Sequence, residues 1–386
     1  MTQRRTAPLL TARALGRATL DRQLLLRRSE MAVLDAVEWL VGLQAQAPRP
    51  PYYALAARLA DFRPQELSGL LETRQAVRIS AMRSTLHLVS ARDARLLRPL
   101  HQPVHDRTLR GNFAKTLVGV DLDRLAAEAR TLVEQRPLTF QELGQRLQED
   151  WPQHDHRSLS MAARQMLPLV QVTPRALWGR SGPAAHTTLD TWLARAARPA
   201  GEPGPAAEDP QEDLAAVLLR YLAAFGPASV KDMQTWCGLT RLREVIAPLR
   251  PRLRTFRDES GEELFDLPDA PLPHPDTEAP VRFLPEFDNL TLSHADRARV
   301  IAPEYQGRTW DRNVAHRVLL VDGTVRGLWR IDTAGGAAQL TIEAFAPLTG
   351  AERAAVEGEA AGVLRMTAPD ATYDIRYGRV AKGATP

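Results

Sequence analysis

Apolar positions along the first two thirds of the chain repeat one order three times: helical periodicity comes first, and two short strands follow. In the first copy, Met31 to Gln44 places its apolar residues on one helical face. A second helix is expected to begin at Pro64, because proline suits the first turn of a helix. Val77 to Met82 and Thr85 to Val89 then alternate as paired strands.

The second copy shows the same order less regularly. Thr139 is a predicted cap that follows one amphipathic helix and begins the next. A third helix is predicted over Ser158 to Leu167. Two short strands, Leu169 to Val172 and Ala176 to Trp178, are expected on either side of a Thr-Pro-Arg turn.

The third copy shows the pattern most clearly. Leu214 to Phe225 is a predicted helix that stops at a Gly-Pro pair. Ser229 and Thr240 are predicted to cap two further helices, and a hairpin is expected over Leu253 to Leu267. Three helices followed by a hairpin is the order of a winged helix, in which the hairpin forms the wing. The alternative is three generic helical segments with incidental hairpins.

The last part of the chain has a different pattern. After the proline-rich stretch 268–280, apolar and polar residues alternate, with a strong hairpin signal at Asp322-Gly323 and one helix at Leu348 to Met366. We expect a mostly β domain there, either barrel-like or a curved sheet. The predicted organisation is α+β, with winged helices at 9–118, 119–196 and 211–268, a linker at 197–210, and the β-rich domain at 281–380.

Composition narrows the class of protein. A hydrophobic fraction of 44% supports a globular core, and no run approaches the ~20 apolar residues of a membrane span. The net charge of +4 permits a polyanionic partner without establishing one. Cys237 is the only cysteine, which excludes an internal disulfide and a cysteine-held zinc or iron–sulfur site. We therefore expect a cytoplasmic protein.

The first candidate for chemistry is Gln44-Ala45-Gln46. Prolines at 48, 50 and 51 end the preceding helix and favour extended backbone, in which residues two apart share one side. Two convergent amides can hold a water molecule or a nucleobase edge, although neither is a strong base. A polar helix end without function is the alternative interpretation.

Other polar clusters have structural alternatives. Thr85 and His87 share a strand face and could line the same cleft as the glutamines, or His87 could be an ordinary histidine of a sheet. The polar segment after Leu284 is expected to be a turn network that docks the C-terminal domain. His101 and His105 have the helical spacing of metal ligands, but without a third ligand we expect a solvated pair.

Four segments together carry a resemblance to a known family. They are Leu43 to Gln46, Arg83 to Val89, Leu219 to Pro227, and Leu284 to Leu290, in that order along the chain. In this combination the chain resembles the winged-helix DNA glycosylase superfamily of the AlkZ and YcaQ type, over roughly residues 9 to 375.

The resemblance implies a C-shaped protein with tandem winged helices and a C-terminal β domain around a DNA cleft. It also implies excision of N7-alkylpurines, and unhooking of interstrand crosslinks by some members. The AlkZ-type branch carries Gln-x-Gln at the catalytic position, which matches Gln44 and Gln46 here. The YcaQ-type branch has an acid in place of the second glutamine.

The hypothesis from these observations is a DNA glycosylase that acts on double-stranded DNA containing alkylated bases or crosslinks. It is expected to be a monomer without cofactor or metal, associated with the nucleoid of a bacterial cytoplasm. Two rivals remain open: a winged-helix transcriptional regulator without catalysis, and a scaffold that recognises damage without cutting. The candidate residues are Gln44 and Gln46 for catalysis, Arg83, Thr85 and His87 as cleft lining, and Arg49, Arg254 and Arg257 for contacts to DNA.

Overall fold

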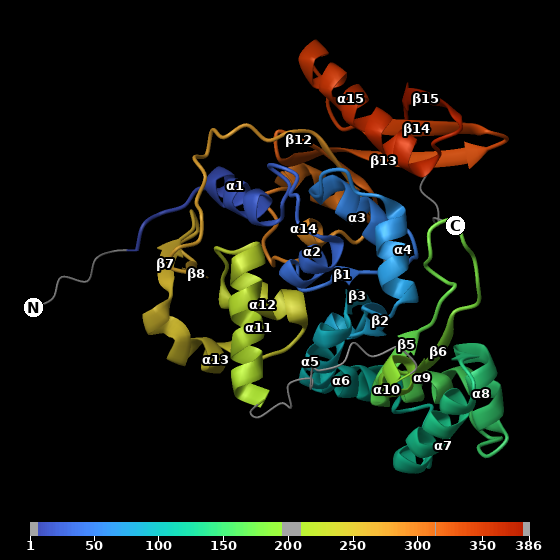
Figure 1. Cartoon of the computed structure of the whole chain (residues 1–386). Coiled ribbons are helices and arrows are strands. Elements are labelled where there is room, and N and C mark those ends of the chain that lie inside the picture. The colour runs from blue at the N-terminus through green and yellow to red at the C-terminus, as the bar shows by residue number, and fades with distance from the viewer. Residues whose placement is uncertain (1–6, 195–209, 313, 381–386) are drawn as a thin grey trace, which may run out of the picture.

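The computed structural model describes residues 7–194, 210–312 and 314–380 (Figure 1). In Figure 1 the blue helices lie near the middle, the yellow and the green helices lie on opposite sides of the view, and a red sheet with one long helix lies at one end. The structure confirms the mixed α and β class expected from the sequence. No described helix is both long and apolar enough to cross a membrane.

The first segment is mostly helical and includes three of the strands. Its elements are α1 (Ala12–Arg22), α2 (Val33–Trp39), β1 (Leu43–Gln44), α3 (Pro50–Arg58), α4 (Pro64–Glu72), β2 (Ala76–Ser80), β3 (Leu86–Ser90), α5 (Ala91–Leu100) and α6 (Gln102–Phe113). The second segment comprises α7 (Leu122–Gln135), β4 (Leu138–Thr139), α8 (Phe140–Gln148), α9 (His156–Met166), β5 (Leu169–Gln171), β6 (Ala185–Thr188) and α10 (Leu189–Ala194).

The third segment comprises α11 (Pro210–Phe225), α12 (Val230–Cys237), α13 (Leu242–Leu249), β7 (Arg254–Arg257) and β8 (Glu263–Asp266). The C-terminal part comprises β9 (Arg282–Leu284), α14 (Asn289–Leu292), β10 (Trp310–Asp311), β11 (Val314–Ala315), β12 (Val318–Val321), β13 (Thr324–Ala334), β14 (Ala337–Ala344), α15 (Gly350–Thr367) and β15 (Thr372–Tyr377). Helix starts follow local chemistry: Thr139 and Ser229 accept hydrogen bonds from the backbone three residues later, each within a capping box.

Strands of the first two segments belong to one sheet, in the order β1-β3-β2-β5-β6-β4. The β2–β3 hairpin of the first segment pairs with β5 of the second, through Arg78 opposite Gln171 and Ile79 opposite Val170. The two segments therefore share a sheet, whereas β7 and β8 of the third segment form a separate hairpin. The division into three winged helices stays a prediction.

Several local expectations were wrong, each for a backbone reason. Residues 176–178 do not form a strand, because Ala176 adopts a left-handed backbone (φ 71°), and β5 pairs with β6 instead. Thr240 does not cap α13, since the capping residue is Arg241, which is also left-handed. Most of the expected linker lies outside the described residues, but Pro210 already begins α11.

The C-terminal sheet is open, in the order β15-β14-β13-β12-β9, and does not close as a barrel. Asp322 and Gly323 are both left-handed and make the tight turn between β12 and β13 that the sequence predicted. Helix α15 packs against this sheet through Val356, Ala360 and Leu364, all of which are fully buried.

The segment after β9 joins the C-terminal part to the first segment. The carboxylate of Asp288 accepts hydrogen bonds at 2.8 and 2.7 Å from the guanidinium of Arg58 on α3, and both side chains are fully buried. Asn289 donates to the carbonyl of Gly42 at 2.8 Å. These contacts show that the polar segment docks the C-terminal part, as expected, and that it docks beside β1.

Asp288→Ala is expected to lower the free energy of unfolding by about 3–5 kcal/mol, because it leaves the Arg58 charge buried without its partner. Urea unfolding measures this loss. The double variant Arg58→Met/Asp288→Leu removes both charges and should lose less. A loss of under about 1 kcal/mol in Asp288→Ala, as for a surface pair, would contradict the argument.

Candidate active site

The backbone before Gln44 makes a sharp turn that the sequence analysis missed. Helix α2 ends at Trp39, five residues earlier than predicted, and Val41 and Gly42 follow with φ 52° and 88°. A Cβ on Gly42 would lie 2.6 Å from Val89 Cγ1, so only glycine fits. This turn starts β1, so Gln44 lies in a short strand and Gln46 follows two residues later, just beyond it.

Strand β1 sits at the edge of the six-stranded sheet, beside β3. Gln44 lies opposite His87, and the amide of Ala45 donates to the carbonyl of Leu86 at 2.7 Å. On the other side, the buried guanidinium of Arg78 donates to the Ala45 carbonyl at 2.5 Å. The backbone between the two glutamines is therefore held on both sides.

The Gln44 side chain is buried, but its surroundings are polar. Its Oε1 accepts a hydrogen bond at 2.7 Å from Arg83, which also donates to the backbone carbonyl of Trp236 at the end of α12. Because guanidinium only donates, this contact determines which end of the amide faces Arg83. Arg83 thus connects Gln44 to the third helical segment.

Gln46 differs from Gln44 in exposure. Its side chain is exposed, and its Oε1 accepts from the backbone N–H of Leu86 at the longer distance of 3.3 Å. Both carbonyl oxygens therefore face donors of the β2–β3 hairpin. The two amides are organised by the same hairpin, one beneath the surface and one on it.

The charges next to the motif are positive. Burial lowers the pKa of Arg83 to about 10, and burial with the nearby Arg175 lowers that of Arg78 to about 9. Both guanidinium groups stay charged at neutral pH. A polyanion that approaches Gln46 would therefore meet a favourable field.

His87 is uncharged at neutral pH. Burial, and next the charge of Arg83, lower its pKa to about 3, and its Nδ1 lies 2.9 Å from the Thr85 carbonyl. Thr85 in turn donates its hydroxyl to the Met82 carbonyl at 3.0 Å. The structure therefore brings Arg83, Thr85 and His87 together beside the glutamines, with His87 unable to supply a proton near neutral pH.

A buried polar layer lies behind this hairpin. Ser84 donates to the side-chain carbonyl of Gln165 at 2.7 Å, and His105 Nδ1 lies 2.7 Å from the same oxygen. His101 and His105 are fully buried, so the expectation of a solvated pair was wrong. Within the described ranges, no three histidine, cysteine or acidic side chains are grouped so as to hold a metal ion.

Comparison with known proteins identifies the family of this chain. A family model described as "DNA glycosylase AlkZ-like" matches residues 37–366, which is most of the chain. The chain belongs to the AlkZ-like DNA glycosylase family. The family name makes it a DNA glycosylase, with DNA as its partner.

Two comparisons with Streptomyces sahachiroi proteins support the assignment. An "Interstrand DNA cross-link repair glycosylase" is 26% identical over 379 residues, covering 90% of this chain and 94% of that protein. The solved structure of the DNA glycosylase AlkZ matches with a TM-score of 0.77 at 21% identity, covering 96% of this chain and 100% of that one. The structural match shows a shared fold.

The predicted DNA-contacting arginines of this AlkZ-like glycosylase lie in different places. Arg49 is exposed, three residues after Gln46. Arg254 donates to Asp266 at 3.2 Å and to the Ala270 carbonyl at 2.8 Å, within the hairpin of the third segment. Arg257 is exposed near the tip of that hairpin and donates to the Gly261 carbonyl at 2.9 Å. Only Arg49 adjoins the glutamine motif.

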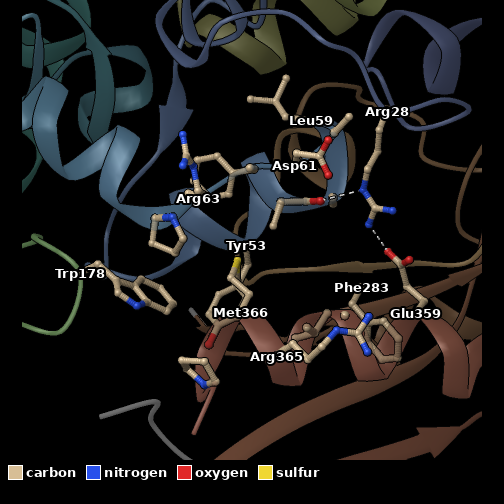
Figure 2. Close-up of a pocket in the computed structure, with 18 of the residues that line it drawn as sticks. Arg28, Tyr53, Leu59, Asp61, Arg63, Trp178, Phe283, Glu359, Arg365 and Met366 are labelled. Carbon is tan, nitrogen blue, oxygen red and sulfur yellow. Dashed lines mark hydrogen bonds and ion pairs between the residues drawn. The ribbon is translucent and has the colours of Figure 1, made fainter.

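Two cavities flank Trp178, which lies on the loop between β5 and β6. One, of about 330 Å³, is lined by residues that directly follow Gln46, including Pro48 and Arg49. The other, of about 720 Å³, lies between α3–α4 and α15 and is lined by Tyr53 and Arg365 (Figure 2). Neither Gln44 nor Gln46 lines either cavity, and only the smaller one adjoins their segment.

The sequence predicted Arg83 as a cleft residue, but it did not predict Arg78, Arg164 or Trp178 near the site. The sequence did indicate a role for Arg78, because this residue stands between Val77 and Ile79 in a strand with the apolar pattern of a buried one. A buried charge needs a polar partner, which predicts a polar contact for Arg78. Arg164 carried no comparable signal, although it donates to the Ser84 carbonyl at 3.2 Å. Trp178 was assigned to a strand, which hid its place in a loop.

Arg83→Met is expected to lower kcat for base release by about 10- to 100-fold with a smaller change in KM, because Gln44 loses a charged donor. Arg83→Lys should recover part of the loss. Arg107→Met is a matched control, because Arg107 donates to the neighbouring Gly238 carbonyl and not to Gln44. Unchanged kcat in Arg83→Met, with normal melting behaviour, would contradict this role.

Stability of the AlkZ-like glycosylase is expected to fall in acid. The pKa values of His87 and His186 are lowered to about 3, and those of His101 and His105 to about 4, in each case mainly by burial. The unfolded chain therefore binds more protons than the folded protein below about pH 6.5. The free energy of unfolding should decrease as pH falls from about 6.5 towards 4.

Urea midpoints between pH 7.5 and 4.5 measure this dependence. Substituting the exposed His274 by alanine should leave the slope unchanged. A midpoint that stays constant across this range would exclude the buried neutral histidines.

Proposed function

We propose that this DNA glycosylase hydrolyses the N-glycosidic bond of cationic N7-alkylated purines in duplex DNA, with Gln44 and Gln46 as its catalytic residues. The observation that carries the proposal is the pair of amides two residues apart at the sheet edge, held by Arg83 and by the Leu86 amide beside a positive field. The AlkZ-like family match supports the same activity.

The substrate class follows from what the amides can do. A cationic purine is already a good leaving group, so its departure requires no strong acid, and neutral His87 supplies none. The remaining tasks are to place a water molecule and to stabilise an oxocarbenium-like sugar. Neutral, undamaged bases lack the positive charge and should react far more slowly.

The two glutamines have different roles in this proposal. The Arg83 charge draws electron density from the Gln44 carbonyl, which weakens that oxygen as an acceptor and strengthens the amide N–H groups as donors. The Gln46 carbonyl has only a long contact to a backbone amide. We therefore assign Gln46 Oε1 as the acceptor for a proton of the water and Gln44 Nε2 as a donor to its oxygen.

The reaction balances without a cofactor. The water oxygen bonds to C1′ of the sugar as the bond from C1′ to the purine nitrogen breaks. The electron pair of that bond moves to the purine and cancels its positive charge. The proton of the attacking water passes to solvent, which leaves an abasic sugar and a neutral free base.

Unhooking of interstrand crosslinks is the further part of the proposal. A crosslink through N7 of two purines contains the same cationic base and the same scissile bond. The S. sahachiroi relative is named for interstrand cross-link repair, which supports this extension.

Gln44→Ala and Gln46→Ala are each expected to lower kcat for 7-methylguanine release by about 100-fold, as when one positioned hydrogen-bonding group is removed. Alkali-labile abasic sites in a labelled duplex measure release. Gln46→Glu should keep more activity than Gln44→Glu, because a carboxylate at 44 would pair with Arg83 and lose the donor.

Other outcomes separate the alternatives. Undiminished release in both alanine variants would remove the site assignment. Lesion-selective binding without release from any alkylated or crosslinked duplex would favour damage recognition. Binding without lesion selectivity or release would favour a regulator.

A further inference from the structure

A pocket of about 330 Å³ opens directly beyond the catalytic segment. Pro48 and Arg49 form one wall, and the loop that carries Arg175, Trp178 and Arg180 forms the other. A cavity of this volume is at the lower end of the range for small-ligand sites and suits one planar ring system. The proposed catalysis does not use it.

Glu286 lines this pocket and is the acidic residue of its wall. Its side chain is buried, with only 4% of the residue exposed, and Oε2 accepts from Arg317 Nε at 2.7 Å. The other oxygen, Oε1, is buried and receives no hydrogen bond within the described part of the chain. A carboxylate oxygen accepts hydrogen bonds, so a ligand that satisfies Oε1 must present an N–H or O–H donor.

Trp178 offers an aromatic surface in the same wall. It is half-buried, and its ring is backed by Tyr52 at a centroid distance of 4.9 Å. The Tyr52 hydroxyl donates to the Ala176 carbonyl at 2.6 Å, which attaches the loop to α3. A supported aromatic ring beside a pocket can stack on a nucleobase with little loss of its own freedom.

The rim of the pocket is basic. Arg49 and Arg180 are exposed, and Arg175 is half-buried and donates to the Gly182 carbonyl at 3.0 Å. Arginines in this arrangement suit the phosphates on either side of a displaced nucleotide. The pocket thus combines a basic rim, an aromatic side chain in its wall, and a buried carboxylate with one unpaired oxygen.

We propose that this pocket binds an unpaired guanine-type base of the DNA. Trp178 contacts the ring, Glu286 Oε1 accepts a hydrogen bond from the Watson–Crick edge, and the three arginines contact the flanking phosphates. Guanine presents adjacent N1–H and N2–H donors on that edge, whereas thymine presents one N–H between two carbonyl oxygens that the carboxylate repels. Alkylation at N7 leaves both guanine donors in place.

The inference rests on the proposed function only in taking DNA as the ligand. Its test is a binding experiment that requires no catalysis, so it can fail or succeed independently of base release. Fluorescence anisotropy would compare undamaged duplexes that carry a single-nucleotide guanine bulge, a thymine bulge, or no bulge. Gln44→Ala should behave like the unmodified protein in this assay.

The guanine bulge is expected to bind at least about 5-fold more tightly than the thymine bulge. This ratio is the smallest discrimination expected from one specific contact to a base. Glu286→Gln and Trp178→Ala should each remove this preference and leave the affinity for the fully paired duplex unchanged. Glu359→Gln is the matched control, because Glu359 lines the cavity on the other side of Trp178 and pairs with Arg28 at 2.5 Å (Figure 2).

No preference for the guanine bulge would overturn the proposal. So would a preference that survives both Glu286→Gln and Trp178→Ala. Melting temperatures of the variants separate a lost pocket from a lost fold, and Trp178→Ala remains informative if Glu286→Gln disturbs Arg317.

Release kinetics then identify the source of the base. If the lesion itself occupies the pocket, Glu286→Gln should lower kcat/KM for 7-methylguanine whatever bases flank it. If an undamaged neighbour occupies the pocket, kcat/KM should fall only in duplexes that carry guanine next to the lesion.

Discussion

The left-handed turn at Val41 and Gly42 is the constraint on which the site depends. It ends α2 and starts β1, which places Gln44 at the edge of the sheet. A positive φ is costly for a β-branched residue such as Val41, so the surrounding structure must stabilise the turn. Asn289 does so by donating to the Gly42 carbonyl, and the buried pair of Asp288 and Arg58 fixes Asn289 in place. The C-terminal part therefore acts on the glutamines without touching them.

Buried arginines explain why amides suit this site. A carboxylate at position 44 would form an ion pair with Arg83 and lose its freedom to contact a substrate, whereas an amide accepts from Arg83 and still presents N–H donors. Position 46 is exposed and has only a backbone contact, so its chemistry is less constrained. In the proposed function, the same charges that organise the amides would attract the phosphates of DNA.

Sequence patterns predicted much of the fold, because helix caps, hairpins and tight turns depend on residues that are adjacent in the chain. The capped helices after Thr139 and Ser229, the β2–β3 hairpin, and the Asp322-Gly323 turn depend on neighbouring residues, and the structure confirms them. One of the errors occurred where a distant contact also acts on the backbone. The strand assigned to residues 176–178 is a loop, because Tyr52 holds the Ala176 carbonyl across 124 positions of the chain. Candidate residues were found by type and spacing, but their partners were not.

The sequence by itself determined the α+β class, the resemblance to a glycosylase family, and the two glutamines as candidates for chemistry. These three conclusions follow from hydrophobic periodicity, turn residues and short motifs, each of which involves residues close together in the sequence. Only the tertiary structure decided that Arg83 reaches Gln44, that Arg78 holds the backbone between the glutamines, and that Glu286 lies at a pocket beside them. Such contacts join residues far apart in the chain, and their geometry is set by how whole elements pack, which no local pattern encodes.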